Sequence, residues 1–290
     1  MDKITTAVLE DIPALRELFR VSFSAQEEEL DLFFSMRFAP LDTLVYRRNG
    51  ALLAALYLWD CDVACAGKRL GADYIYAAAT CEELRRQGIM AKLLDYAAEY
   101  SRGRGRDFLL LSPADSELFS YYGKRGFSNA FYAKCFTLSR KTLSLLARGA
   151  SGKGITTGAD SIRGLWACAY SRADGVVWSR EVLEYDMALL KLAAVGSGDK
   201  LRAYAFWQQE YDGAVQIVDA QAQAGSVPAL AAELLRQSDA DFFEFALPSD
   251  FPLSVDDFSI EPVGMLRPLS AAGESSASLL RNAYMGLTMA

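Results

Sequence analysis

The chain has 290 residues, of which 52% are hydrophobic and 23% are charged, the balance of a globular protein with one large domain or two smaller ones. Its net charge of −7 argues against nucleic acids and anionic membranes as partners, because both are negatively charged. The complete absence of histidine excludes serine–histidine and cysteine–histidine catalysis and histidine-bound zinc.

Neither an export signal nor a membrane span is predicted. The first residues, "MDKITTAVLEDIPAL", include early acidic side chains and no long apolar run. The longest apolar run, residues 51–59, is far shorter than the roughly 20 residues that span a bilayer. Five cysteines without a CxxC spacing are expected to be reduced thiols, not metal ligands. We therefore expect a cytoplasmic protein without a metal.

The first half of the sequence predicts alternating strands and helices. Asn49-Gly50 predicts a hairpin turn, because both residue types tolerate positive φ. Asp11 is expected to cap the first helix. In chain order, the predicted elements are a strand at 3–11, helices from 11 and from 27, strands within 43–59, a strand at 72–80, a helix to about 100, a strand at 106–115, a short helix from 117 to Gly126, and a strand at 131–139.

The second half repeats this order. "ITTG" at residue 155 resembles "ITTA" at residue 4, and "DFFEFALPSD" resembles "DFLLLSPAD". We predict two copies of one αβ unit, at residues 1–146 and 155–290, joined by the Gly/Ser-rich linker 147–154. The second copy is predicted to have a helix capped by Asp160, a helix over 179–190, a hairpin turning on Asp212-Gly213 and a helix at 227–235.

The two copies differ where chemistry would lie. In the turn before its last helix, the second copy is predicted to lack both the arginine pair and the glycine of the first. It also lacks a counterpart of "YYGKRGF" (residues 121–127). We therefore expect the second copy to be degenerate and structural.

The stretch "CEELRRQGIMAKLL" (residues 81–94) is the candidate binding site of the first copy. A helix start leaves about four N–H groups without acceptors and carries partial positive charge, so it suits a phosphate. Gly88 permits close approach of the backbone, while Arg85 and Arg86 add charged donors. The alternative is an ordinary solvated helix start.

The neighbouring sequence favours the phosphate interpretation. A strand precedes the turn, an apolar helix follows it, and a buried strand and "YYGKRGF" come later. Together these features resemble the GNAT superfamily of N-acetyltransferases, in which the pyrophosphate of acetyl-CoA lies on an Arg/Gln-x-x-Gly-x-Gly/Ala loop. Met90 stands in place of the last glycine of that loop, as in the tandem branch of the enhanced-intracellular-survival aminoglycoside acetyltransferases. Members of that branch end in a sterol-carrier-like domain, which this chain is too short to include.

The resemblance implies an α/β fold with a mixed sheet, built as tandem GNAT-like folds of which the second is degenerate. It implies that the main chain of Ala78 and Thr80 lies along the pantetheine arm. It assigns Tyr122 as the acid that protonates the departing thiolate, although a purely packing role is the alternative. The loop residues that would hold the pyrophosphate are Arg85, Arg86, Gln87, Gly88, Met90 and Ala91.

The general base is left open. The strand position that carries a carboxylate in many relatives is Tyr74 here, with Tyr76 on the same face, and a phenol titrates near ~10. Water is another proton acceptor. Further candidates near the acceptor amine are Glu27, Glu28 and Glu29, although a glutamate run also suits a helix start through the macrodipole. In the aminoglycoside-modifying branch the chain terminus enters the active site, which adds the carboxylate of Ala290.

Three functions follow from these observations. The first is an acetyl-CoA-dependent N-acetyltransferase acting on a small-molecule or peptide amine, for which the acidic chain suits a cationic acceptor. The second is a non-catalytic acyl-CoA-binding sensor. The third is an unrelated α/β protein whose Arg85 and Arg86 merely begin a surface helix.

Overall fold

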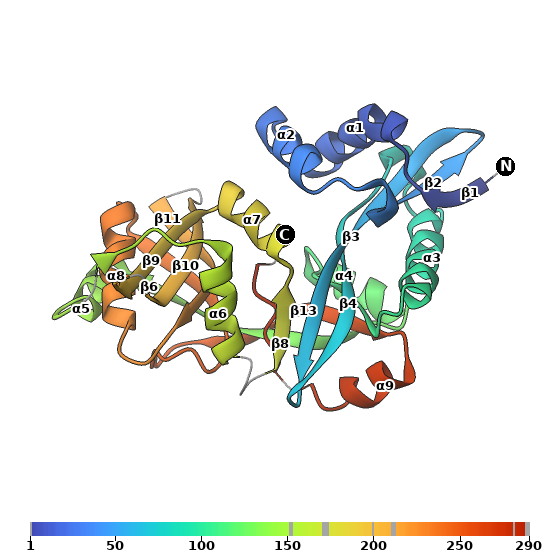
Figure 1. Cartoon of the computed structure of the whole chain (residues 1–290). Helices are drawn as coiled ribbons and strands as arrows, with labels where there is room; N and C mark the ends of the chain where they lie inside the picture. Colours follow the sequence, from blue (N-terminus) through green and yellow to red (C-terminus); the bar gives the residue numbers. More distant parts are fainter. Residues whose placement is uncertain are drawn as a thin grey trace. The chain divides into compact units, whose positions relative to one another are not determined.

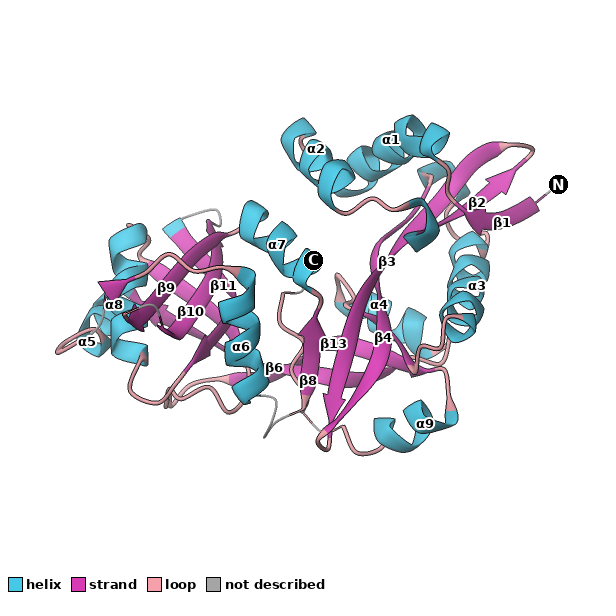
Figure 2. Cartoon of the chain, in the orientation of Figure 1, coloured by secondary structure: helices cyan, strands magenta, loops and turns pink. Residues whose placement is uncertain are grey.

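The computed structural model describes residues 2–150, 153–169, 174–198, 200–209, 213–280 and 282–287 (Figure 1). These residues form two compact units, each assembled from separate stretches of the sequence. The first unit comprises residues 1–63, 69–129 and 265–279. The second unit comprises residues 64–68, 130–264 and 280–290. Both units combine helices with strands, as Figure 2 shows, so the predicted α/β class with a mixed sheet is confirmed.

The first unit begins with a short strand and two helices. Strand β1 (Asp2–Thr6) is shorter than predicted, because a 3-10 turn starts at Leu9. Helix α1 (Ile12–Phe23) buries Leu15, Leu18 and Phe19. Helix α2 (Glu27–Met36) begins at a capping box, in which Glu29 accepts a hydrogen bond from the Gln26 N–H at 3.0 Å.

Three antiparallel strands follow, and their turns explain the sheet order. The pair β2 (Thr43–Arg48) and β3 (Ala51–Cys65) is joined at Asn49 and Gly50, whose φ angles are +51° and +88°, as predicted. Strand β4 (Lys68–Thr80) follows β3 and is longer than predicted. Strand β1 pairs with β2, which gives the order β1-β2-β3-β4.

A helix then crosses to a strand parallel to β4. Helix α3 (Ile89–Gly103) leads to β5 (Phe108–Leu111), then α4 (Ser116–Gly123) and β6 (Ser128–Ser139). Helix α4 ends at Gly123, earlier than predicted, and Gly126 follows it with φ +82°. The buried face of α3 includes Leu93 and Leu94, each 0% exposed. Full burial of such a side chain contributes about 1.5–3 kcal/mol, so this face anchors α3 on the sheet.

The second unit repeats the plan with additional elements. Helix α7 begins after Ser179, whose hydroxyl caps it by accepting a hydrogen bond from the Val182 N–H. Asp160 is the second residue of α6 and not its cap. Asp212 of the predicted hairpin turn lies outside the described residues, while Gly213 has φ +79°. The elements are α5 (Arg140–Leu146), β7 (Lys153–Gly154), α6 (Ala159–Ala169), β8 (Gly175–Trp178), α7 (Arg180–Leu189), β9 (Lys191–Ser197), β10 (Lys200–Gln209), β11 (Ala214–Ala222), α8 (Val227–Gln237) and β12 (Phe242–Leu247).

One prediction about the second copy is wrong. Its turn before α8 does contain a glycine, Gly225, and this residue adopts φ +81°, close to the +76° of Gly88. The arginine pair is absent, as predicted. The second turn therefore keeps a left-handed glycine, one residue before the N-cap Ser226 of α8, without the charge of the first turn.

The last strands are exchanged between the two copies. In the second unit, β12 lies parallel to β11 and pairs on its other side with β6, the last strand of the first copy. In the first unit, β5 lies parallel to β4 and pairs with β13 (Ser259–Pro268), the last strand of the second copy. Helix α9 (Ala271–Ala277) completes the first unit. The proposed linker at residues 147–154 divides the sequence into the two copies. It does not divide the compact units, because each unit contains residues from both sides of the linker.

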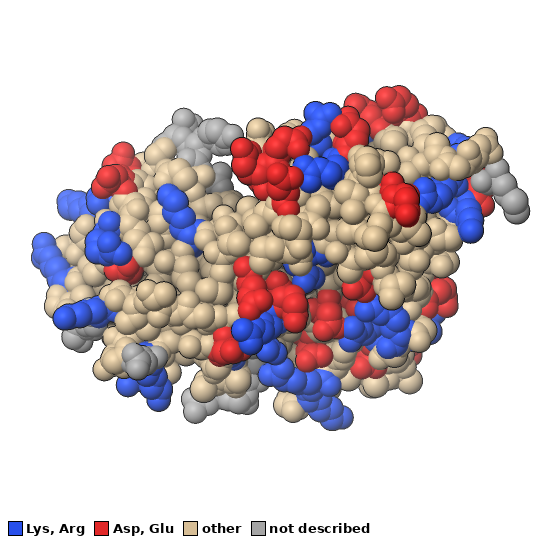
Figure 3. Space-filling model, turned by 45° about the horizontal axis from the view of Figure 1, so that its top comes forward, with Lys and Arg blue, Asp and Glu red and all other residues tan. Residues whose placement is uncertain are grey.

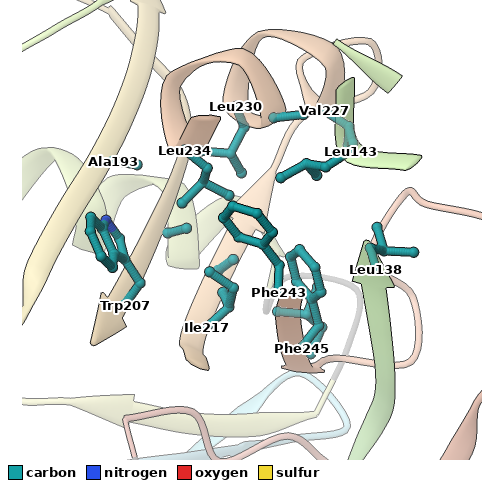
Figure 4. Packing of buried hydrophobic residues seen from close by; sticks show 14 of the residues in the cluster. Leu138, Leu143, Ala193, Trp207, Ile217, Val227, Leu230, Leu234, Phe243 and Phe245 are labelled. Atoms are coloured by element: carbon teal, nitrogen blue, oxygen red, sulfur yellow. The ribbon is translucent and has the colours of Figure 1, made fainter. Parts of the chain in front are cut away.

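The core of the second unit lies under α8. Figure 4 shows Leu230 and Leu234 of this helix facing Phe243 of β12 and Ile217 of β11. All four side chains are at most 4% exposed. Among the described residues, no helix is long and apolar enough to cross a membrane.

Candidate active site

The turn between β4 and α3 is shaped by positive φ angles. Gly88 is the N-cap of α3 and adopts φ +76° and ψ +8°. Arg86 also has a positive φ, +64°, which is uncommon without glycine. Residues 85–88 are exposed, and a side chain built at Gly88 would meet no atom within 4 Å. The outer side of this turn is therefore open.

The main-chain amides of residues 86–91 have no acceptor in the described part of the chain. The first N–H bond at this helix start runs from Lys92 to the Gly88 carbonyl, at 3.2 Å, and no side chain caps the helix. By contrast, α4 is capped by Asp115 and α5 by Ser139. An uncapped start with open amides is the arrangement that binds an anionic oxygen best.

The two arginines of the turn have different surroundings. Arg85 donates from Nε to the Thr80 carbonyl at 3.2 Å, which ties the turn to the end of β4. Arg86 has no hydrogen-bond or ion-pair partner within the described ranges. Gln87 donates to the Glu83 carbonyl at 3.4 Å. Arg86 is therefore the more available cation for a bound anion.

Strands β4 and β5 separate just before this turn. Their parallel pairing runs from Ala72 opposite Phe108 to Tyr74 opposite Leu110. Strand β5 ends one residue later, at Leu111, whereas β4 continues to Thr80. The remaining six residues of β4, 75–80, therefore continue beyond the paired region without pairing to β5. We call this opening the first gap.

The β4 segment that borders the first gap carries a kink and a buried hydroxyl. Ala77 adopts φ +48°, a left-handed conformation that costs free energy in a residue with a side chain. Thr80 is 9% exposed, and its hydroxyl has no hydrogen-bond partner among the described residues. Ala77 and Ala78 are half-buried and small. Strain and an unsatisfied polar atom are both frequent at ligand sites.

Tyr122 lies at the end of α4, within the core of the first unit. Its ring contacts Tyr121 and Phe127 edge-on, at 5.2 and 5.8 Å between centroids. The side chain is 9% exposed, and no described residue accepts or donates a hydrogen bond at its hydroxyl. Burial, followed by the neighbouring Tyr121, raises the pKa of Tyr122 to about 12. The phenol therefore stays protonated at neutral pH and can donate a proton.

Two of the candidate cofactor residues border the hydrophobic cluster that contains Tyr122. Tyr122, Ile89 and Ile75 belong to this cluster, and Ala78 and Met90 pack against it. The start of α3, the kinked part of β4 and the end of α4 therefore border one core. The structure brings together three segments that are far apart in the sequence.

Tyr74 and Tyr76 belong to a different cluster, on the other face of β4 from Ile75. The Tyr76 ring stacks on Trp59 of β3 at 4.0 Å and lies 5.7 Å from Phe33 of α2. Tyr74 is 4% exposed and lies 6.3 Å from Trp59. We call this set the aromatic cluster; it also includes Phe19 and Tyr57. Sequence patterns indicated apolar faces on α1 and α2 but not that they meet these two tyrosines.

The glutamates at the start of α2 are exposed. Glu27 forms an ion pair with Arg16 at 2.8 Å, and Glu29 caps its own helix through the Gln26 N–H. The side chain of Glu28 makes no hydrogen bond or ion pair with another described residue. Ala290 lies outside the described residues, so its suggested role stays a prediction of the family resemblance. Within the described ranges, no three Cys, Asp or Glu side chains gather as metal ligands.

Comparison with known proteins agrees with this geometry. Residues 3–130 match the family model described as the GNAT acetyltransferase domain. The sequence has no significant match among curated proteins. Solved structures match at low identity, so they report on the fold alone.

Three of these structures cover nearly the whole chain. A GCN5-related N-acetyltransferase from Anabaena variabilis has a TM-score of 0.78 at 15% identity, with 94% of this chain and 74% of that chain covered. A GCN5-related N-acetyltransferase from Kribbella flavida has a TM-score of 0.73 at 18% identity, with 94% and 73% covered. Eis1 from Mycobacterium abscessus has a TM-score of 0.62 at 16% identity, with 96% and 76% covered.

The predicted GNAT resemblance is therefore confirmed for the domain, whereas the narrower assignment to the enhanced-intracellular-survival branch stays a prediction. The matched segment contains the open amides, the first gap and Tyr122. Residues 3–130 match the GNAT acetyltransferase domain, and this match supports an enzyme of the N-acetyltransferase type.

Proposed function

We propose that the first unit binds acetyl-CoA and transfers its acetyl group directly to the amine of a small-molecule or peptide acceptor. The observation that carries this proposal is the row of open amides at residues 86–91, next to a gap between β4 and β5. The amides of Arg86, Gln87, Gly88, Met90 and Ala91, with the side chains of Arg85 and Arg86, would hold the pyrophosphate. The main chain of Ala78 and Thr80 would hold the pantetheine arm.

The transfer needs one proton donor on the protein. The amine nitrogen attacks the thioester carbonyl carbon, the carbon–sulfur bond breaks, and the sulfur leaves as a thiolate. Tyr122 would donate its phenolic proton to that sulfur, a role supported by the lack of a hydrogen-bond partner among the described residues, while its raised pKa keeps the phenol protonated until the thiolate forms. The packing of Ala78 and Met90 against the cluster that contains Tyr122 supports placing the phenol beside the same ligand.

The proton of the attacking amine needs an acceptor. The carboxylate of β4, Asp73, is fully buried and forms ion pairs with Arg104 and Arg106. Residues 74–80, YIYAAAT, offer only the phenols of Tyr74, which is almost fully buried, and Tyr76, which is half-buried. We therefore propose transfer to water, with Glu28 as the remaining candidate among the three glutamates, since Glu27 forms an ion pair and Glu29 caps its own helix.

The acceptor is proposed to be a cationic amine, on the basis of the net charge of −7. Local charge does not sharpen this proposal, since acidic and basic side chains lie intermixed on the face shown in Figure 3. The aromatic cluster is the apolar surface closest in sequence to the kinked β4 segment.

The second candidate is a non-catalytic acyl-CoA sensor, which is favoured by Tyr74 at the strand position that carries a carboxylate in many relatives. One experiment separates the two functions. The purified chain and its Tyr122→Phe variant are incubated with acetyl-CoA and a panel of a polyamine, an aminoglycoside, an arylalkylamine and a dipeptide, and free coenzyme A is quantified chromatographically. Acceptor-dependent release that is lost in the variant supports the enzyme. Tight acetyl-CoA binding without release for any acceptor supports the sensor.

A further inference from the structure

The second unit contains a counterpart of the first gap. The parallel pairing of β11 with β12 ends at Ile217 opposite Phe245, as that of β4 with β5 ends at Tyr74 opposite Leu110. Both strands continue without pairing to each other, β11 to Ala222 and β12 to Leu247. We call this opening the second gap.

The C-terminal segment of the chain, residues 282–287, lies in the second unit, and residues 283–287 are buried there. Ala283, Tyr284, Met285 and Leu287 are each at most 3% exposed. The carbonyls of Ala283 and Tyr284 accept hydrogen bonds from the Tyr132 and Val176 N–H groups, at 2.8 and 2.9 Å. The indole of Trp178 donates to the Met285 carbonyl at 2.9 Å. The segment is therefore fixed along its length by main-chain bonds.

Two contacts place this segment at the second gap. The Tyr284 hydroxyl donates to the carbonyl of Ala246, one residue past the last paired residue of β12, at 3.0 Å. Gly286 lies against Asp219, two residues past the last paired residue of β11, and a Cβ on Gly286 would come within 2.8 Å of its carboxylate oxygen. One short stretch of chain thus touches both strands just beyond the point where they separate.

Asp219 is itself held by two buried hydrogen bonds in series. The indole of Trp166 donates to the Tyr204 hydroxyl, and this hydroxyl donates to the Asp219 carboxylate, both at 2.5 Å. Asp219 is 1% exposed. By position, two residues past the last pair, Asp219 is the counterpart of Tyr76 in the aromatic cluster. At this position the second unit therefore has the hydrogen-bonded carboxylate of Asp219, and the first unit has the half-buried ring of Tyr76.

We propose that the C-terminal segment is a built-in occupant of the second gap, which closes the second unit to acyl-CoA. The segment lies at the inner end of the second gap, one and two residues past the last pair. Under the proposed function, the arm in the first unit runs from the turn along Thr80 and Ala78 towards this inner end, so the comparison rests on that function. The closure itself rests on the contacts of Tyr284 and Gly286.

The test opens the second gap with a single methyl group. Gly286→Ala forces a Cβ onto Asp219, and Gly198→Ala is the matched control, since Gly198 has nearly the same φ, +59° against +57°, with no atom within 4 Å of an added Cβ. Hydrogen exchange of residues 283–286 reports release of the segment, and equilibrium dialysis with acetyl-CoA reports the number of sites. We expect one bound acetyl-CoA in the parent chain and in the control, and a second, weaker equivalent in Gly286→Ala, whose segment exchanges faster.

The proposal is overturned if the segment is released in Gly286→Ala but no second acetyl-CoA binds. It is also overturned if the hydrogen-exchange rate of the segment in Gly286→Ala equals that in the control variant. If Gly286→Ala does not fold, Tyr284→Ala is measured in the same way, because it removes the bond to Ala246 without a clash. A parent chain that binds no acetyl-CoA would count against the proposed function. In that case a new acetyl-CoA site in Gly286→Ala would still support the closure of the second gap, and the absence of such a site would overturn it.

Discussion

The two gaps of this molecule have the same strand pattern and different contents. The first gap is bordered by a kink at Ala77, an unsatisfied Thr80 hydroxyl and a row of open amides. The second gap is contacted on both sides by the chain's own C-terminal segment, with Asp219 and Tyr284 fully committed to internal hydrogen bonds. The polar groups named here are thus unsatisfied at the first gap, where a ligand is expected, and hydrogen-bonded at the second gap.

The largest effect is expected at the proton donor of the first gap. Tyr122→Phe keeps the buried ring and its contacts with Phe127, so the fold and acetyl-CoA affinity should change little. Because general acid catalysis typically contributes 10²–10⁴-fold, kcat should fall by roughly that factor. Steady-state kinetics with the best acceptor of the panel measures this. An unchanged kcat would assign Tyr122 to packing alone.

A second prediction concerns the pH dependence that Asp219 imposes on the second unit. Burial raises the pKa of Asp219 from 3.8 to about 6, against the opposing hydrogen bonds of Tyr204 and Tyr284. Since the folded-state pKa is the higher one, the stability linked to this group is fully present below pH 3.8 and is lost as the pH rises through about 6. The loss is about 3 kcal/mol for a shift of this size.

Asp219→Asn should remove this dependence, because the amide oxygen still accepts from Tyr204 and carries no charge. Urea unfolding of both proteins at pH 4 and pH 7 measures the difference in unfolding free energy. Relative to the variant, the parent chain should lose stability between the two pH values. Parallel pH profiles would show that Asp219 does not titrate in this range.

A third change copies a feature of the second unit into the first. Helix α8 carries Pro228 at its second position, where α3 has Met90. Met90→Pro removes one of the open amides in a part of the helix that tolerates proline, whereas Met90→Ala keeps the amide. We expect acetyl-CoA affinity to fall about tenfold in the first variant only, the size of one hydrogen bond to a charged group. Isothermal titration calorimetry gives both affinities, and equal values in the two variants would remove the Met90 amide from the site.

The smallest effect is expected from the arginines of the turn. Arg86→Ala should weaken acetyl-CoA binding by about threefold to tenfold at low salt, and less at high salt, because exposed charges are screened. Arg85→Ala should have the smaller effect on binding, since its side chain is tied to the Thr80 carbonyl. Titrations at two ionic strengths test both variants. Unchanged affinity in both would support an ordinary surface helix start.

Local signals in the sequence predicted most elements of the first unit, because turn residues such as Asn49 and Gly50, and the apolar faces of α1 and α3, act over short distances. They did not predict β13, since its place beside β5 depends on an exchange between residues more than a hundred positions apart. The kink at Ala77 was also missed, because alanine carries no signal for positive φ.

The candidate site was predicted in part for the same reason. Gly88 and the arginines predict a phosphate-binding turn from the local sequence, and a family resemblance assigned Tyr122 as the general acid. The closure of the second gap could not be predicted, because Asp219 and Gly286 are brought together by the fold alone.

The central claim is that the amides around Gly88 hold acetyl-CoA. Amide hydrogen exchange of the unmodified chain, with and without saturating acetyl-CoA, tests it most directly. We predict slower exchange at residues 86–91 and no change at residues 223–229 before and at the start of α8. Binding that leaves residues 86–91 unprotected would contradict the account.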